Sequence, residues 1–266
     1  MPAPDAAPDL PRRSSGAVLT GVVAALPAEL GPLLGGAGGA EGGTARRGGR
    51  ADRSRLGTRI HEVDAWEGAA VGAEEGGRIV AAISGVGKVA AARAAAALVA
   101  EGATRLLVVG TCGGLGPSEE VGQLVHARRA VQWDLAVREG REFEADGALL
   151  EAWRAVAGGS EGTFLTADRP AIRLRDRVRR ARAAAGRHPG PAVADMEVAA
   201  VAAVASQAGI PWAALKVVSD ARPTLLASLR GAGGGLRAFE EALRTHGGRP
   251  AATVPALCRA LAERSQ

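Results

Sequence analysis

The 266-residue sequence predicts a single three-layer α/β/α domain with a central, mostly parallel mixed sheet. Short apolar runs rich in Val, Leu and Ala alternate with Ala-rich segments of helical length, which is the pattern of strands covered by helices on both faces. The composition agrees with this prediction. Hydrophobic residues make up 47% of the chain, enough for a sizeable core, although only 3% are aromatic and tyrosine is absent.

The first expected strand follows a proline-rich tail. Residues 1–17 carry four prolines and mixed charge, so we predict a disordered tail there and a domain over 18–266. Residues 17–25 are the first buried strand. Pro27 then suits the first turn of a helix, where its missing N–H has no partner to lose. Residues 35–57 are rich in Gly and Arg, which predicts a flexible loop.

The middle and the end of the chain continue the alternation of strands and helices. Gly85-x-Gly87-x-x-Ala90 formally matches a dinucleotide fingerprint, but no acid follows the next strand, so we interpret it as a tight turn. The expected strands cover 61–66, 78–84, 105–109, 121–132 and 163–167, and the expected helices cover 85–102, 147–156, 172–184, 236–245 and 254–264.

Residues 191–223 are predicted to form a strand, a buried helix and a second strand. One strand ends at Asp195 and the other at Asp220, and the Ala/Val-rich helix between them stops at Gly209. Polar groups also follow two earlier strands. Because such ends meet at one edge of an α/β sheet, we expect a shared site made of Glu29, Thr111 with Gly113 and Gly114, Asp195 with Glu197, and Ser219 with Asp220.

Composition argues against several classes of protein. Cys112 and Cys258 lie far apart in unrelated contexts, so we expect no disulfide framework and a reducing, cytoplasmic location. The four histidines are scattered without metal-ligand spacing, so we expect no metal ion and no cofactor. No apolar run approaches the ~18 residues of a membrane span. The net charge of +5 is local and Arg-rich, which favours a solvated basic face over nucleic-acid binding.

The remaining chemistry is that of carboxylates. A pair of them can cleave a glycosidic bond, because one protonates the leaving group while the other activates water. The acid must be partly protonated near neutral pH. We expect Asp220 to be buried at the end of its apolar strand, since burial raises the pKa of a carboxyl group.

Five segments occur in the order and approximate spacing of a known family: GVVAALPAEL, SGVGKVAAA, GTCGGL, ADMEVAAVAAVA and VVSDA. Over about residues 18–223 the chain resembles the nucleoside phosphorylase/nucleosidase superfamily, and within it most of all the bacterial methylthioadenosine/S-adenosylhomocysteine nucleosidases. The resemblance implies that a small purine nucleoside is the partner. It also implies a homodimer, because members often complete the pocket with a neighbour's loop.

The resemblance also implies two catalytic residues. Asp220 would be the general acid that protonates N7 of the departing purine, with Ser219 helping to orient it. Glu29 would be the base that activates water.

Further residues would bind the substrate. Glu197 would hold the ribose hydroxyls, Met196 would pack against the sugar, and Thr111 would lie near the nucleophile. Gly113 lets the backbone come close to a ligand. Lys216 stands where the family nucleosidases usually have Arg, although Lys is not equivalent to it as a fork-shaped donor.

Several alternatives stay open. Phosphorylases of this superfamily carry an arginine where this chain has Val108, and a phosphate dianion without a cationic clamp is poorly held, so we favour water as the nucleophile. The segment Thr166–Pro170 lacks the aromatic that commonly stacks on adenine, for which Phe164 is a substitute. The sequence is also similar to hopanoid-associated members, which act on an adenosylated lipid. A non-catalytic nucleotide-binding module is the alternative of another class.

Overall fold

A computed structural model describes residues 18–34, 53–55, 57–63, 77–137, 140–172, 174–185, 190–221 and 234–264. The tail expected over 1–17 lies outside the described residues, as does 35–52 of the expected flexible loop. The helices are α1 (Pro27–Leu30), α2 (Lys88–Ala100), α3 (Gly147–Ala157), α4 (Leu174–Ala185), α5 (Val198–Gln207), α7 (Gly234–His246), α8 (Arg249–Ala252) and α9 (Val254–Glu263). The strands are β1 (Leu19–Ala24), β2 (Arg53–Arg55), β3 (Thr58–Val63), β4 (Arg78–Ile83), β5 (Arg105–Gly114), β6 (Leu124–Gln132), β7 (Glu142–Glu144), β8 (Ser160–Thr166), β9 (Ala192–Asp195) and β10 (Trp212–Asp220).

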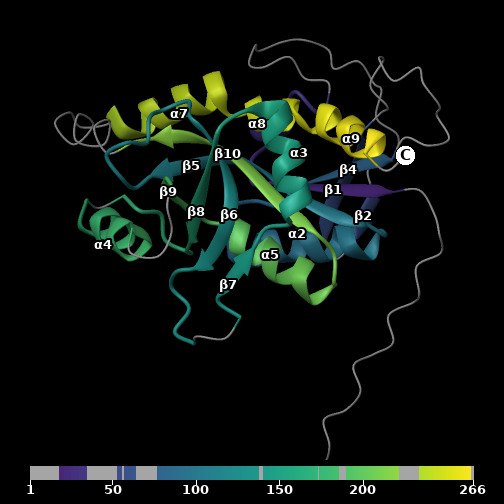
Figure 1. The fold of residues 1–266 in the computed structure, drawn as a ribbon, viewed down its shortest axis with the longest axis horizontal. Helices are drawn as coiled ribbons and strands as arrows, with labels where there is room; N and C mark the ends of the chain where they lie inside the picture. The colour runs from purple at the N-terminus through teal and green to yellow at the C-terminus, as the bar shows by residue number, and fades with distance from the viewer. Residues whose placement is uncertain are drawn as a thin grey trace, which may run out of the picture.

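The strands form one mixed sheet with helices on both faces, which confirms the predicted fold class (Figure 1). Alternate residues of a strand point to opposite faces. In β1, Val23 packs in a cluster with α2 and α5, whereas Val22 packs in a second cluster with α3, α8 and α9. Helices α2 and α5 contribute to the same core cluster, and most of their buried residues are alanines. Because these side chains are small, the core can be closely packed although the chain has few aromatic residues.

Along the sheet the strands follow the order β10-β6-β8-β9-β5-β1-β4-β3-β2, and β10 also pairs with β5. This extra pairing closes five strands, namely β10, β6, β8, β9 and β5, into a ring. The pairings of β5 with β1 and β10 are parallel, while β10 meets β6 and β9 meets β5 in antiparallel fashion. The ring brings the ends of β5, β9 and β10 close together.

Three features differ from the sequence-based expectation. Strand β2 lies within 35–57, so residues 53–55 are not the flexible connection that we expected, and β7 was not expected at all. Both are three-residue strands, Arg-Ser-Arg and Glu-Phe-Glu, without the apolar pattern that indicates a strand. Strand β5 continues to Gly114 instead of turning after Val109, because its last residues pair with β10 and β9.

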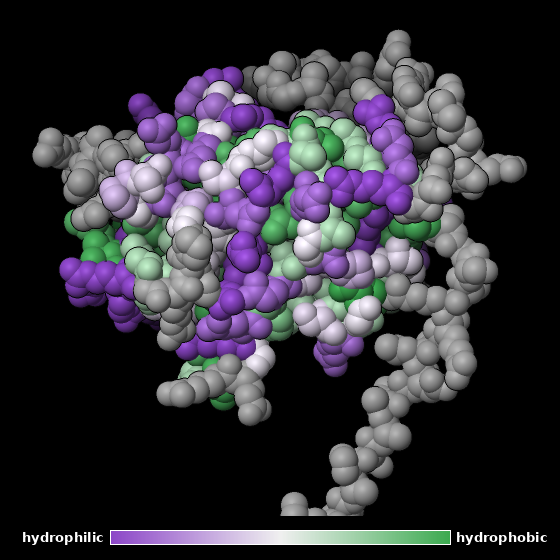
Figure 2. Space-filling view, in the orientation of Figure 1, coloured by the Kyte–Doolittle hydropathy of each residue, from purple (hydrophilic) through white to green (hydrophobic). Residues whose placement is uncertain are grey.

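The surface is polar over much of the face shown in Figure 2, including the region of α4, where hydrophilic side chains gather. No described helix combines the length and the apolar character needed to cross a membrane.

Candidate functional site

A cavity of about 490 Å³ opens where β1, β5, β9 and β10 end. Most of the site residues expected from the sequence line it, although they come from four distant parts of the chain. They are Glu29, Thr111, Gly113, Asp195, Met196, Glu197, Ser219 and Asp220. The rest of the wall is mainly apolar and includes Leu26, Val86, Pro170, Ile172 and Phe239.

Glu29 lies at one end of the cavity in the first turn of α1 and is only 2% exposed. Its Oε2 atom accepts hydrogen bonds of 3.0 Å from the backbone N–H groups of Ala25 and Leu26. Its Oε1 atom accepts one from the Thr111 N–H, at 2.8 Å, and one from the Thr111 hydroxyl, at 3.0 Å. These four bonds fix the carboxylate and aim it at the Thr111 wall of the cavity.

Gly110 makes room for this carboxylate. Its φ is +138°, and a Cβ atom at this position would lie 2.6–2.8 Å from the carboxyl atoms of Glu29, so no other residue fits. Burial raises the pKa of Glu29 above its ordinary value, while the charge of Lys216 and the hydrogen bonds from Leu26 and Thr111 oppose the rise. A glutamate with a raised pKa is a stronger base than an ordinary one.

Glu197 and Lys216 form a buried ion pair behind the cavity wall. The Lys216 ammonium lies 2.8 Å from Oε2 of Glu197 and 3.3 Å from Oδ2 of Asp195. Burial alone would lower the pKa of Lys216, but the carboxylates of Glu197, Asp195 and Glu29 raise it above its ordinary value. The second Glu197 oxygen accepts a 3.0 Å bond from the Gly87 N–H.

Lys216 is only 1% exposed and is not among the residues that line the cavity. We therefore correct its expected role as a substrate-binding residue. Its ammonium pairs with the two carboxylates, so it orients Glu197 from behind the wall of the cavity.

Asp195 is a structural acid that starts α5. Its Oδ2 atom accepts the N–H groups of Glu197, at 2.9 Å, and Val198, at 2.7 Å, which are unpaired donors at the helix N-terminus. The Thr166 hydroxyl donates to Oδ1 at 2.5 Å. These bonds fix the turn that carries Met196 and Glu197 into the cavity.

Asp220 is the last residue of β10 and also lines the cavity. The register of β10 against β5 shifts between Val218 and Asp220, which is a β-bulge at Ser219. Bulges re-aim side chains, and here Asp220 pairs with Gly113. The Ser219 hydroxyl lies 3.1 Å from Asp220 Oδ1 and 3.2 Å from the Cys112 carbonyl oxygen.

The expectation that Asp220 is buried is wrong. Its side chain is 31% exposed, because Asp220 is the last residue of the strand and follows the bulge at Ser219, and its Oδ2 atom forms an ion pair with Arg177. Arg177 comes from α4 and lines the same cavity.

Sequence reasoning missed Arg177 and Phe239. Arg177 looked like any other arginine of a basic helix, and Phe239 lies in α7, outside every motif. Phe164 does not take the place of an aromatic in the wall, since it is fully buried in the core of β8 and Phe239 lines the cavity instead. Val108 is also fully buried in the sheet. Cys112 faces the cavity, but burial raises the pKa of its thiol, which fits a packed residue.

Within the described residues, His, Cys, Asp and Glu side chains form no group of three or more that could hold a metal ion. Arg177 is the single cationic side chain in the wall of the cavity, counting described residues alone, and it is bound to Asp220.

The mixed sheet and the cavity at its strand ends, lined by carboxylates and apolar side chains, define an α/β protein with a candidate site at one edge of its sheet. The chain belongs to the phosphorylase superfamily, whose family profile matches residues 20–254. No curated protein sequence matches the chain significantly.

Solved structures of nucleosidases share the fold. The methylthioadenosine/S-adenosylhomocysteine nucleosidase of Colwellia psychrerythraea, in complex with adenine, has a TM-score of 0.71 and 20% identity, covering 92% of this chain and 96% of that one. An Asp-to-Asn mutant of the Helicobacter pylori enzyme, with 5′-methylthioadenosine in the active site, has a TM-score of 0.69 and 19% identity, covering 92% and 99%. A Helicobacter pylori futalosine hydrolase mutant has a TM-score of 0.66 and 18% identity, covering 93% and 100%. At such identities the likeness establishes the fold.

Proposed function

We propose that the protein hydrolyses the N-glycosidic bond of an adenosine-type purine nucleoside and releases the free base and the sugar. The observation that carries the proposal is that Glu29, Glu197 and Asp220, three carboxylates in different environments, line one cavity of about 490 Å³. Membership of the phosphorylase superfamily and the fold shared with nucleosidases support it.

The proposed reaction assigns one task to each carboxylate. Water adds to C1′ of the sugar while Glu29 takes a proton from it. The C1′–N9 bond breaks, its electron pair stays with the purine, and Asp220 delivers a proton to N7. Glu197 accepts hydrogen bonds from the ribose hydroxyls between these two ends, and its pairing with Lys216 keeps it in place.

Water is the better nucleophile for this cavity. Phosphate needs cationic donors to hold its charge. The one cation in the described wall, Arg177, is bound to Asp220 at the end assigned to the base, and Glu29 would repel a phosphate at the other end.

The activity test uses methylthioadenosine, S-adenosylhomocysteine, adenosine and inosine, each with and without inorganic phosphate. We expect release of free adenine from at least one adenosine-type substrate at the same rate in both conditions, measured by chromatography of the base and the sugar. Strict dependence on phosphate with a sugar 1-phosphate product would instead establish phosphorolysis. Absence of base release from all four would contradict the proposed function.

Thr111→Val is expected to move the acidic limb of the kcat/KM profile to higher pH. The Thr111 hydroxyl donates to the charged form of Glu29 and so lowers the pKa of that carboxyl group. Removing the donor raises this pKa further, and the base is then protonated over a wider acidic range. The measurement is base release between pH 4 and 9, roughly the span over which such groups titrate. Thr163→Val, a buried threonine outside the cavity wall, is the control. An unchanged acidic limb of the kcat/KM profile would mean that the ionisation of Glu29 does not determine it.

From the resemblance we also propose that the protein is a homodimer and that it is located in the cytoplasm. Light scattering coupled to size-exclusion chromatography gives the number of subunits directly, and a monomer would contradict it.

A further inference from the structure

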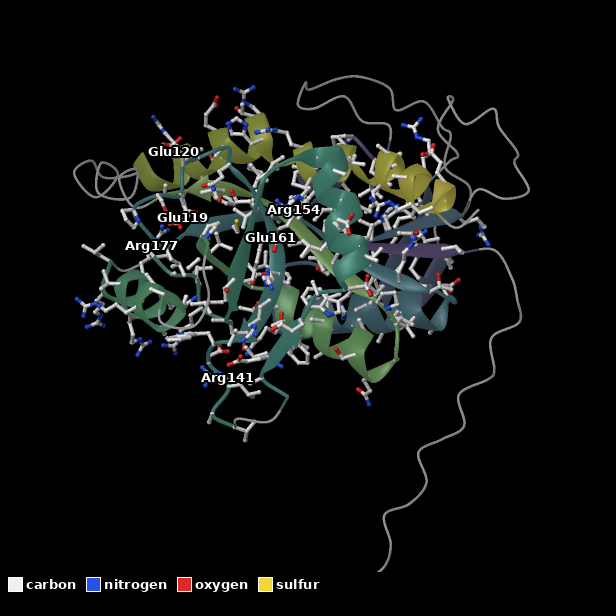
Figure 3. The ribbon with its side chains drawn as sticks, viewed as in Figure 1. Glu119, Glu120, Arg141, Arg154, Glu161 and Arg177 are labelled. Carbon is white, nitrogen blue, oxygen red and sulfur yellow. The ribbon has the colours of Figure 1, made fainter. Side chains whose placement is uncertain are left out.

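Arg177 is one of two buried arginines, with Arg180, in the basic helix α4. The sequence of α4 contains five arginines, of which Arg175, Arg179 and Arg182 are exposed. Arg177 is only 3% exposed and lies on the side of the helix that faces the strands, as Figure 3 shows. Burying a guanidinium is costly unless its donors are all used, so its contacts are informative.

All three guanidinium nitrogens of Arg177 have partners on different parts of the fold. Nε donates to the Ala171 carbonyl oxygen at 2.6 Å, and Nη1 donates to the Gly114 carbonyl oxygen at 2.7 Å. Nη2 forms the ion pair with Oδ2 of Asp220. Arg177 thus ties together the loop before α4, the end of β5 and the end of β10.

These contacts fix the orientation of the Asp220 carboxyl group. Arg177 holds Oδ2, and the Ser219 hydroxyl lies at hydrogen-bonding distance from Oδ1. Gly113 makes space for both partners, because a Cβ atom there would lie 3.3 Å from Asp220 Oδ1 and 3.5 Å from Arg177 Nη2. A Cβ atom there would make a tight contact with Asp220 and an ordinary one with Arg177. The site is therefore built around the pair and not around Asp220 alone.

We propose that Arg177 is the positioning residue for the acid at the base end of the cavity, an inference that rests on the proposed nucleosidase function. When Asp220 gives its proton to N7 of the leaving purine, negative charge develops on the carboxyl group. The guanidinium already stands beside it, so its contact with the neutral carboxyl group becomes an ion pair as the proton leaves. An interaction that is stronger in the transition state than in the ground state raises kcat.

The bond from Nε to Ala171 adds a second consequence. Pro170, Ala171 and Ile172 form one wall of the cavity, so Arg177 couples the position of that wall to the acid. A purine base that binds against this loop therefore lies at a fixed distance from the Asp220 carboxyl group. Fixing such a distance is how a positioning residue contributes to catalysis.

The test compares Arg177→Ala and Arg177→Lys with Arg175→Met, an exposed position of the same helix, on the nucleoside that the wild-type protein cleaves best. We expect Arg177→Ala to lower kcat on the order of 100-fold with a smaller change in KM, Arg177→Lys to retain part of the activity, and Arg175→Met to match the wild type. Thermal unfolding of each variant reports whether the fold is kept.

Chemical rescue separates positioning by charge from simple space filling. Guanidinium at concentrations far below those that unfold proteins should restore part of the kcat of Arg177→Ala, whereas urea, which has the same shape without the charge, should not. Equal recovery with urea, or wild-type kcat in Arg177→Ala, would overturn the inference. So would a loss that neither guanidinium nor the Lys variant recovers, since it would make Arg177 purely structural. A wild-type protein inactive on every nucleoside would instead overturn the proposed function itself.

Discussion

Asp220→Asn is expected to lower kcat for a purine nucleoside by about 10²- to 10⁴-fold, which is the usual contribution of a general acid. Asparagine keeps the shape of the side chain, and its amide oxygen can still accept from Arg177, but it has no proton acidic enough to give to N7. The fold should survive, because Asp220 is partly exposed at the end of β10 and supports no buried layer.

Initial rates of base release at saturating substrate measure this loss, and thermal unfolding verifies the fold. Glu151→Gln, a carboxyl-to-amide change on the exposed face of α3, is the matched control and should behave as the wild type. Wild-type turnover in Asp220→Asn would show that Asp220 is not the general acid. Arg177 would then be the remaining polar group at that end of the cavity.

Lys216→Met is expected to have the largest effect on stability, lowering the free energy of unfolding by about 3–5 kcal/mol. Methionine has a similar length and would fill the space. However, the side chains of Asp195 and Glu197 are 0% and 6% exposed, and both would lose the cation that pairs with them. Two buried carboxylates would then lie close together with hydrogen bonds from neutral donors only and no cation, with Glu29 a third negative group nearby.

Urea unfolding of the wild type and the variant measures the difference. Lys88→Met is the matched control, because Lys88 also pairs with two acids, Asp134 and Asp168, yet both acids are far more exposed. Exposed pairs contribute about 0–1 kcal/mol, so the control should lose little. A loss below 1 kcal/mol for Lys216→Met, roughly the value of an exposed pair, would mean that the buried pairs contribute no more to stability than exposed ones.

The sequence was sufficient to predict the features that depend on a local pattern of residues. Apolar runs marked the buried strands β1, β5 and β10, and the acids Glu29, Glu197 and Asp220 stood out because each follows such a run. Parallel strands place their carboxyl ends at one edge of the sheet, so the convergence of these acids on one cavity could be expected from the sequence.

Features that depend on distant pairing could not be predicted. The burial of Arg177 depends on its contacts with the ends of β5 and β10, and nothing in the helix sequence separates it from Arg175 or Arg179. The position of Lys216 behind the wall follows from its pairing with Glu197, which lies in the turn between β9 and α5. The exposure of Asp220 follows from the bulge at Ser219, a register shift that no pattern of apolar residues indicates.

The ring formed by β10, β6, β8, β9 and β5 also affects how the protein meets other copies of itself. A closed ring has no unpaired row of backbone N–H and C=O groups to template another strand. At the far end of the described sheet the last strand is β2, which is three residues long and contains two arginines, and the side strand β7 contains two glutamates. Short, charged edges discourage strand addition. The architecture that assembles the cavity thereby protects the sheet against edge-to-edge aggregation.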